Sequence, residues 1–184
     1  MYGEMKQNQQ LSYAENRQWS DIWIPEIRRI VGPYLLEPSS FEVDTTQATD
    51  LVIVSSAKIQ IACRVRRKGY LPKYAHDFTV RSQTKFGTKT ELEKLIGGAA
   101  DWMFYAHEGD SDFARWMLLN LDVWRREMIV NKRVRSAASR ANRIPNGDGT
   151  YFNAFDVRDF PADLLISTSH NDAREIAIQI GQIS

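Results

Sequence analysis

The sequence has little cysteine, no long apolar run and almost no net charge, and each shortage excludes a class of protein. Cys63 is the single cysteine among 184 residues, which excludes an internal disulfide and a multi-cysteine zinc site. No stretch approaches the roughly 18 consecutive apolar residues that a membrane span requires, and residues 1–10 lack the apolar segment of a secretory signal. We therefore expect a cytoplasmic protein without membrane contact.

Histidine and glycine patterns exclude two further kinds of site. The three histidines, His76, His107 and His170, lie far apart in the sequence and have no metal-ligand spacing. The glycine-containing segments 97–98 and 146–149 do not have the spacing of a phosphate-binding loop. We expect the histidines to be packed or solvated side chains rather than metal ligands.

The chain does contain enough apolar residues to build a core. Its composition is 43% hydrophobic and 11% aromatic, which argues against disorder. A length of 184 residues is close to the usual size of one domain, about 150 residues. Residues 1–184 are therefore predicted to form a single domain.

Charge is segregated along the chain although the net charge is only +1. Residues 64–94 hold nine Lys or Arg against three acids, and residues 125–143 hold seven against one. These two segments together have a net charge of +12, and the remainder has −11. A basic side of this kind attracts polyanions by neutralising phosphates and releasing counterions. The alternative is that the two halves neutralise each other across the fold.

Periodicity predicts alternating helices and strands. Residues 11–31 have helical spacing, with Pro25 either kinking the helix or opening a second one. The other predicted helices are residues 91–97, after a capping box at 88–91, and 122–130, after Asp122 as the cap. The predicted strands are 34–37 or 41–44, then 50–54, 59–67, 76–81, 101–107, 113–121 and 151–157. Residues 131–149 are predicted to be a long basic loop, and 175–183 fit either period.

Two neighbouring strands carry the arginines that are the main candidates for contact with phosphate. On strand 59–67, Cys63 belongs to the apolar face and is expected in the core, whereas Arg64 and Arg66 belong to the opposite face. Arg81 belongs to the polar face of the strand that follows. We expect the three guanidinium groups on one face of adjacent strands, where they would bind phosphate in bidentate fashion without a metal. Alternatively, they form structural ion pairs with acids, the candidates being Asp44, Asp50 and Asp77.

The order of elements over residues 11–130 resembles the PD-(D/E)XK nuclease superfamily. In that superfamily an aspartate opens the second core strand, and an acid-x-lysine triplet on the third completes the site of a metal ion that activates water for phosphodiester hydrolysis. Asp50 occupies the aspartate position, but the matching triplet is Arg64-Val65-Arg66 and lacks the carboxylate. The segments 61–67, 77–81 and 89–92 are also similar to uncharacterised bacteriophage and prophage proteins. The resemblance implies an α/β domain with a central mixed β-sheet flanked by helices in an αβββαβ core, and 131–184 as a basic loop plus C-terminal decoration.

A degenerate triplet implies a rebuilt or lost metal site. Mg²⁺ or Mn²⁺ requires oxygen ligands, and two guanidinium groups beside Asp50 repel such ions. The implied catalytic residues are Asp50, Asp77 and Glu26, and the implied metal ligands are Asp50 and Asp44. Each acid has an ordinary alternative: a strand-opening cap for Asp50, a cross-strand ion pair with Arg64 or Arg66 for Asp77, and a solvated helix charge for Glu26. Whether the protein is an enzyme stays open.

Two functions follow from this reasoning. The first is a nuclease-like protein that binds DNA or RNA, with or without metal-dependent cleavage. The second is a phage-encoded protein-interaction module that inhibits a host nucleic-acid enzyme or defence system, and self-association as a homodimer stays open in either case. The residues predicted to contact nucleic acid are Arg64, Arg66, Arg67, Lys68, Arg81, Arg125, Arg126, Arg133 and Arg135.

Overall fold

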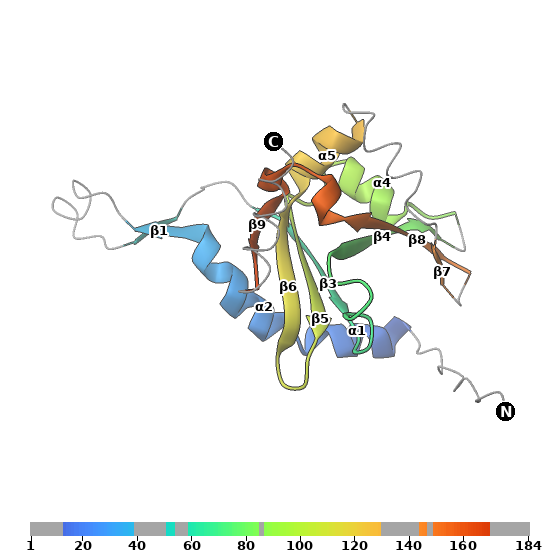
Figure 1. Cartoon of the computed structure of the whole chain (residues 1–184), viewed down its shortest axis with the longest axis horizontal. Helices are drawn as coiled ribbons and strands as arrows, with labels where there is room; N and C mark the ends of the chain where they lie inside the picture. Colours follow the sequence, from blue (N-terminus) through green and yellow to red (C-terminus); the bar gives the residue numbers. More distant parts are fainter. Residues whose placement is uncertain are drawn as a thin grey trace.

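A computed structural model describes residues 13–38, 51–53, 59–84, 87–129, 144–146 and 149–169 (Figure 1). Its helices are α1 (Tyr13–Asp21), α2 (Ile24–Val31), α4 (Glu91–Ile96) and α5 (Leu121–Ile129), with short 3-10 turns η1 (Gly32–Leu35), η2 (Val157–Asp159) and η3 (Ala162–Leu164). Its strands are β1 (Leu36–Pro38), β2 (Leu51–Ile53), β3 (Ile61–Arg66), β4 (Asp77–Gln83), β5 (Trp102–Glu108), β6 (Phe113–Asn120), β7 (Ile144–Pro145), β8 (Tyr151–Asp156) and β9 (Leu165–Thr168). The mixed α/β class expected from the sequence is confirmed.

Three sheets organise the described residues. The largest has the order β3-β5-β6-β9, in which β3 and β5 are parallel and the other pairs are antiparallel. A second sheet has the order β4-β8-β7, and β1 and β2 form a separate antiparallel pair. In Figure 1 this pair lies on the opposite side of the four-stranded sheet from β4, β7 and β8. The segment 131–149, predicted to be a long loop, contains a short strand, β7.

Helix α2 covers one face of the four-stranded sheet. Ile27 and Val31, four residues apart, lie on one side of this helix and pack against Phe104, Ala106 and Leu118 of β5 and β6. Pro25 stands in the first turn of α2, where its missing N–H removes no helical hydrogen bond. The second of the two predictions for Pro25, that it opens a new helix, is confirmed.

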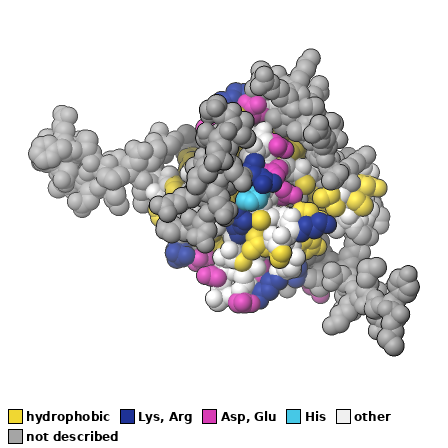
Figure 2. Space-filling model, in the orientation of Figure 1, with side chains coloured by type: hydrophobic (Ala, Val, Ile, Leu, Met, Phe, Trp, Pro, Cys, Tyr) yellow, Lys and Arg dark blue, Asp and Glu magenta, His cyan; other side chains and the backbone are white. Residues whose placement is uncertain are grey.

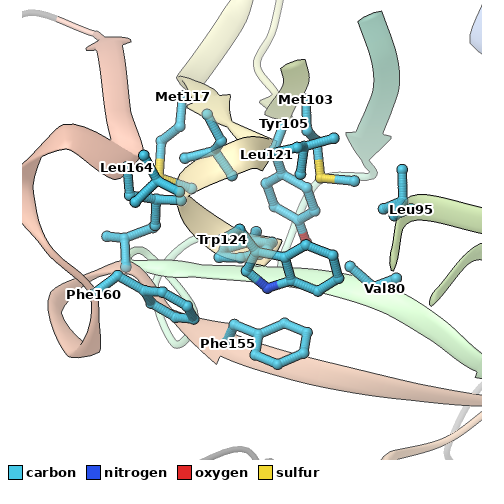
Figure 3. Close-up of a cluster of buried hydrophobic side chains, with 14 of the residues drawn as sticks. Val80, Leu95, Met103, Tyr105, Met117, Leu121, Trp124, Phe155, Phe160 and Leu164 are labelled. Carbon is cyan, nitrogen blue, oxygen red and sulfur yellow. The ribbon is translucent and has the colours of Figure 1, made fainter. Parts of the chain in front are cut away.

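The main core lies on the other face of the sheet (Figure 3). Met103 and Tyr105 of β5 point into it, between residues of β5 that face α2, as strand alternation requires. Trp124 of α5 is fully buried there, edge-on to Phe155 of β8 with ring centroids 5.7 Å apart. Side chains from β4, β8, α4 and α5 thus close over this face of the sheet.

The capping box of helix α4 lies two residues later than predicted. Thr90, rather than Thr88, is the N-cap: its hydroxyl accepts from the Glu93 N–H at 3.1 Å, and the Glu93 carboxylate accepts from the Thr90 N–H at 2.7 Å. The predicted end at Gly97-Gly98 is confirmed, and Gly98 has φ of +83°, a conformation that glycine adopts without strain. The prediction that Asp122 caps helix α5 is wrong: the helix begins at Leu121, and the Asn120 side chain accepts from the Asp122 N–H at 3.0 Å.

Two expectations about strand neighbours and burial are wrong. Strands β3 and β4 belong to different sheets. Cys63 is exposed rather than buried in the core. Strand β3 lies at the edge of its sheet, where α2 does not fully cover the face that carries Cys63. Within the described residues, no helix is long and apolar enough to cross a membrane.

Candidate anion-binding site

Three arginines from two sheets converge on the ring of Phe152. The guanidinium carbons of Arg64, Arg66 and Arg81 lie 4.7, 5.4 and 5.5 Å from the centroid of this ring. Arg64 and Arg66 come from β3, whereas Arg81 and Phe152 face each other directly in the β4–β8 ladder. We call Arg64, Arg66, Arg81 and Phe152 the arginine cluster. The predicted convergence of the three guanidinium groups is confirmed, although adjacent strands do not produce it.

Strand register explains why the cluster stands at one end of the main core. Successive rows across β3, β5 and β6 on the same face of the sheet are Ala62–Met103–Leu119, Arg64–Tyr105–Met117 and Arg66–His107–Arg115. The face therefore changes along its length from apolar to strongly basic. On the side of the molecule in Figure 2, charged side chains of both signs and a histidine lie close together among hydrophobic side chains.

Arg64 is held in place by hydrogen bonds. Its Nη1 donates to the carbonyl of Thr79 and to Oε2 of Glu91, both at 2.7 Å, and its side chain is 16% exposed. Burial lowers the pKa of Arg64, as do the charges of Arg66 and Arg81, while the Glu91 carboxylate raises it. A guanidinium nevertheless stays protonated in proteins. The ion-pair alternative thus applies to Arg64, with Glu91 as a partner that the sequence did not identify.

Arg66 and Arg81 are held differently. The Arg66 guanidinium lies 4.8 Å from the ring centroid of Tyr70, on a second aromatic side chain. The Arg81 backbone N–H donates to Glu91 Oε2 at 2.9 Å, but its buried Nε has no hydrogen-bond partner among the described residues. Aromatic rings attract cations without neutralising them. Glu91 is therefore the one carboxylate seen in hydrogen-bond contact with a cluster of three cations, within the described part of the chain.

Two of the predicted catalytic acids lie away from the cluster. Asp77 faces Asp156 across the β4–β8 ladder, and burial, followed by the Asp156 charge, raises the pKa of Asp77. Glu26 on α2 accepts from Arg29 Nε at 2.8 Å and from Nη2 at 2.5 Å, and these hydrogen bonds lower its pKa. The solvated-helix alternative describes Glu26. Asp44 and Asp50 lie outside the described residues.

The described residues do not fit Mg²⁺ or Mn²⁺ at the arginine cluster. Hard divalent cations require several oxygen ligands, and Glu91 is already committed to Arg64 and to the Arg81 N–H. Three adjacent guanidinium groups repel a cation by Coulomb's law. In the described part of the chain, no group of three or more His, Cys, Asp or Glu is arranged to hold a metal ion.

The remaining predicted contacts differ in how their side chains are occupied. Arg125 donates to the carbonyls of Leu95 and Ala100 at 3.1 and 2.8 Å, and it also pairs with Asp122. The other described basic residues are exposed: Lys68 bonds Asp110 at 2.7 Å, Arg126 pairs with Asp163 at 3.3 Å, and Arg67 stacks 4.4 Å from the Trp19 ring. Arg133 and Arg135 lie outside the described residues.

Four residues of the site were not identified from the sequence. In the sequence, Phe152 and Tyr70 are ordinary aromatic residues, Glu91 belongs to the predicted capping box, and His107 has no neighbouring ligand. The alternation of strand 101–107 does place His107 on the core-facing side with Tyr105. That parity was the available signal, but only the strand register shows that arginines flank His107 on both sides.

A separate hollow of about 270 Å³ lies between β3 and α4. It is lined by Gln60, Ile61, Ala62, Glu91, Lys94, Leu95, Ala99 and Ala100. Its wall is mostly apolar, and Glu91 is already engaged by Arg64. The arginine cluster therefore suits an anion better than this hollow does. Comparison with known proteins adds no further constraint, because no family, curated protein or solved structure matches the chain.

Proposed function

We propose that this protein binds DNA or RNA through its phosphates at the arginine cluster. One observation carries the proposal: three guanidinium groups gather within 5.5 Å of the centroid of a single ring, and among the described residues only that of Arg64 is seen to contact a carboxylate, Glu91. Like charges repel most strongly where water is partly excluded. An arrangement of this kind is stabilised when an anion enters it.

Phosphate suits Arg66 and Arg81, whose guanidinium groups show no carboxylate contact among the described residues. A guanidinium presents a planar fork of N–H donors that matches two phosphate oxygens. Arg66 is positioned by the rings of Tyr70 and Phe152, and such ring contacts do not occupy the N–H groups of a guanidinium. The buried Nε of Arg81 is a further donor without a partner among the described residues. Arg64 has a positioning role, because Glu91 and the Thr79 carbonyl occupy its Nη1.

A polymer fits the surrounding charge better than a small anion does. The segment 64–94 has nine basic and three acidic residues and contributes all three arginines of the cluster. Several of its other basic side chains are exposed: Arg67, Lys68, Lys73, Lys89 and Lys94. Successive phosphates of one strand can contact such a surface, each releasing counterions. This distribution is why we favour nucleic acid over an isolated phosphate compound.

The nuclease-like origin of the fold is part of the proposal. The resemblance to the PD-(D/E)XK superfamily supports it, and the degenerate triplet Arg64-Val65-Arg66 supplies the arginines that replace metal chemistry with direct phosphate contact. Cleavage would require Asp50 and further acids beyond the described residues. If Mg²⁺ or Mn²⁺ promotes cutting of DNA or RNA and Asp50→Ala abolishes it, the protein is also an enzyme.

Binding of fluorescein-labelled single-stranded DNA, duplex DNA and RNA, followed by fluorescence anisotropy at low salt, tests the proposal. We expect Arg66→Ala and Arg81→Ala each to weaken binding about 5- to 30-fold, corresponding to one lost charge-assisted contact of roughly 1–2 kcal/mol. Arg29→Ala is the matched control, because it removes the same charge from an exposed pair with Glu26 on α2. Equal losses in all three variants would show only a general charge effect and contradict a specific site.

The protein-interaction function has one observation in its favour. Ile22 and Ile24, at the junction of α1 and α2, are 64% and 41% exposed, and exposed apolar side chains that lie together can mark a protein contact. If none of the three nucleic acids binds at low salt, the proposal above is wrong and docking on a protein becomes the better explanation.

A further inference from the structure

Tyr70 is an exposed aromatic residue beside the arginine cluster. It lies in the loop between β3 and β4 and is 42% exposed, more than any other aromatic residue whose exposure the structure describes. The guanidinium carbon of Arg66 lies 4.8 Å from the centroid of the Tyr70 ring, over one of its two faces. The ring is therefore presented to solvent next to a cation of the cluster instead of being packed in the core.

Backbone hydrogen bonds hold Tyr70 in position. Its carbonyl accepts from the Lys73 N–H at 3.3 Å and from the Tyr74 N–H at 3.1 Å, so the loop closes into a turn directly after Tyr70. Gly69, just before it, has φ of +95°, a conformation that glycine adopts without strain. A side chain on a backbone that is fixed before the ligand arrives loses less conformational entropy when it binds. The loop thus preorganises the Tyr70 ring.

Two more basic side chains close to Tyr70 in sequence contact aromatic rings. The Arg67 guanidinium carbon lies 4.4 Å from the Trp19 ring centroid, and the Lys73 ammonium nitrogen lies 5.2 Å from the Tyr74 ring centroid. Arg67 and Lys73 are exposed, as is Tyr70. Proteins that bind single-stranded nucleic acid combine cations, which follow the phosphate backbone, with aromatic rings, on which bases stack. The loop carries both kinds of group.

We propose that Tyr70 is a stacking site for one unpaired nucleobase, which makes single-stranded DNA or RNA the preferred ligand. This inference rests on the proposed function and names its ligand class. A sugar joins the base and the phosphate of one nucleotide, so a phosphate bound by Arg66 brings a base close to the ring of Tyr70. Arg66 covers one face of the ring, and the base stacks on the other. In a duplex the bases are paired and stacked on their neighbours, so only the phosphates would reach this surface.

The alternative role of Tyr70 is to hold Arg66 through the cation–π contact alone. In that case the ring acts only through a phosphate contact, and its removal weakens the binding of every strand of equal charge by the same factor. A stacking ring instead adds affinity only for ligands that carry bases. The two roles therefore differ in what they predict for a strand that has phosphates but no bases.

Base-bearing and abasic strands of equal length and charge distinguish the two roles. Short single strands of thymidine nucleotides, of uridine nucleotides and of abasic sugar-phosphate units, and a duplex with the same total number of phosphates, would be titrated into the full-length protein at low salt. Fluorescence anisotropy gives the affinities. We expect both base-bearing strands to bind about 10-fold more tightly than the abasic strand, a difference of roughly 1.4 kcal/mol, and more tightly than the duplex.

The ring protons of Tyr70 provide a direct readout. In NMR spectra they should shift upfield with the base-bearing strands and not with the abasic strand, because a stacked base places them in its ring current. A ring that only holds Arg66 would respond equally to both kinds of strand.

Variants of Tyr70 assign the effect to its ring. In Tyr70→Ala the 10-fold advantage of base-bearing strands over the abasic strand should disappear, whereas Tyr70→Phe keeps the ring and should retain it. The matched control is Tyr34→Ala, because Tyr34 is 37% exposed and its hydroxyl lies 2.6 Å from Ser167 Oγ, within hydrogen-bond distance. This control should leave the advantage unchanged. Tyr70 is exposed, so we expect its variants to fold, which circular dichroism checks.

The outcomes separate this inference from the proposed function. If base-bearing and abasic strands bind equally, or if Tyr70→Ala keeps the advantage of the base-bearing strands, the stacking site is wrong, although salt-sensitive binding would still support the proposed function. A duplex that binds more tightly than the single strands would contradict the preferred ligand in the same way. If no strand binds at low salt, the proposed function is wrong and the stacking site fails with it.

Discussion

Glu91 determines how the arginine cluster is held. Its Oε2 accepts from Arg64 Nη1 and from the Arg81 N–H, so one carboxylate fixes two strands from different sheets. The negative charge of this carboxylate also neutralises part of the positive charge of the cluster, which weakens the attraction of the cluster for phosphate. Stability and anion binding therefore make opposite demands on this residue.

Glu91→Gln separates those two demands. The amide keeps an acceptor of the same size but removes the charge, so we expect the free energy of unfolding to fall by about 1–2 kcal/mol, since the site is partly exposed. Affinity for nucleic acid should rise at the same time, because a competing anion is removed. Urea denaturation and fluorescence anisotropy measure the two effects.

The matched control is Glu26→Gln, which removes an equal charge from the exposed pair with Arg29. It should change affinity much less than Glu91→Gln does. A loss of stability in Glu91→Gln without any gain in affinity would mean that the cluster is a purely structural ion-pair network.

The buried imidazole of His107 makes stability depend on pH. Its pKa in the folded protein is about 4, below the ordinary 6.5, because of burial and the charges of Arg66 and Arg115. The unfolded chain therefore takes up the proton first as the pH falls. Stability is fully present above pH 6.5 and is lost between about pH 6.5 and 4, by at most about 3 kcal/mol.

His107→Phe should remove this part of the acid sensitivity. The charged and titratable groups around the imidazole are Arg66, Tyr105 and Arg115, and His76 lies behind Arg115, with its Nδ1 3.4 Å from Arg115 Nη2. Urea denaturation of wild type and variant at pH 7, 6, 5 and 4 gives the measurement. Parallel pH profiles would show that another group, such as His76, is responsible.

At the scale of elements, Arg125 connects α5 to the end of α4. Its Nη1 donates to the carbonyls of Leu95 and Ala100, which flank the C-terminus of α4, and its side chain is 14% exposed. Carbonyls at a helix C-terminus lack helical partners, and a cation there also complements the helix dipole. The sequence predicts that Arg125 contacts nucleic acid, whereas its hydrogen bonds in the structure connect two helices.

Arg125→Met should therefore destabilise the protein by about 1.5–3 kcal/mol, the usual contribution of hydrogen bonds from a charged donor, without weakening nucleic-acid binding beyond a general charge effect. Arg126→Met is the control, because Arg126 is half exposed and pairs with Asp163 at the surface. Thermal melting and anisotropy provide the readouts. If Arg125→Met instead weakens binding as much as Arg66→Ala does and leaves stability unchanged, Arg125 contacts nucleic acid.

Elements were predictable wherever local sequence determines them. The alternation of residues 59–67 places Arg64 and Arg66 on the face opposite Ile61 and Val65, and the turn before Phe113 separates two strands as expected. Strand pairing was not predictable, because it depends on contacts between distant segments. Thus β2 pairs with β1, and β3 is joined to β5, across a connection that contains β4 and α4.

The candidate site divides in the same way. Arg64, Arg66 and Arg81 were identified from parity and residue type, which act over two or four positions. Phe152 and His107 can be assigned to the site only from the strand register, which places Phe152 opposite Arg81 and His107 opposite Arg66. Glu91 has two roles at once, one in the first turn of α4 and one at Arg64, and the sequence indicates only the first.

At the scale of the whole molecule, charge segregation determines how a polyanion would approach. The segments 64–94 and 125–143 have a net charge of +12, and the remainder has −11, so the chain is strongly dipolar in sequence although its net charge is +1. Long-range attraction by exposed basic residues would bring nucleic acid to the surface. The arginine cluster would then contact individual phosphates, and substitution of its arginines should weaken binding measurably.

The salt dependence of nucleic-acid binding tests the central claim most directly. Anisotropy titrations between 50 and 200 mM salt would be made with the wild type and with the double variant Arg66→Ala, Arg81→Ala. The account predicts that affinity falls steeply with salt in the wild type, and that the slope of log K against log salt becomes shallower in the double variant by about 1.4–1.8, or 0.7–0.9 for each lost phosphate contact. An unchanged slope, or no binding at the lowest salt, would contradict it.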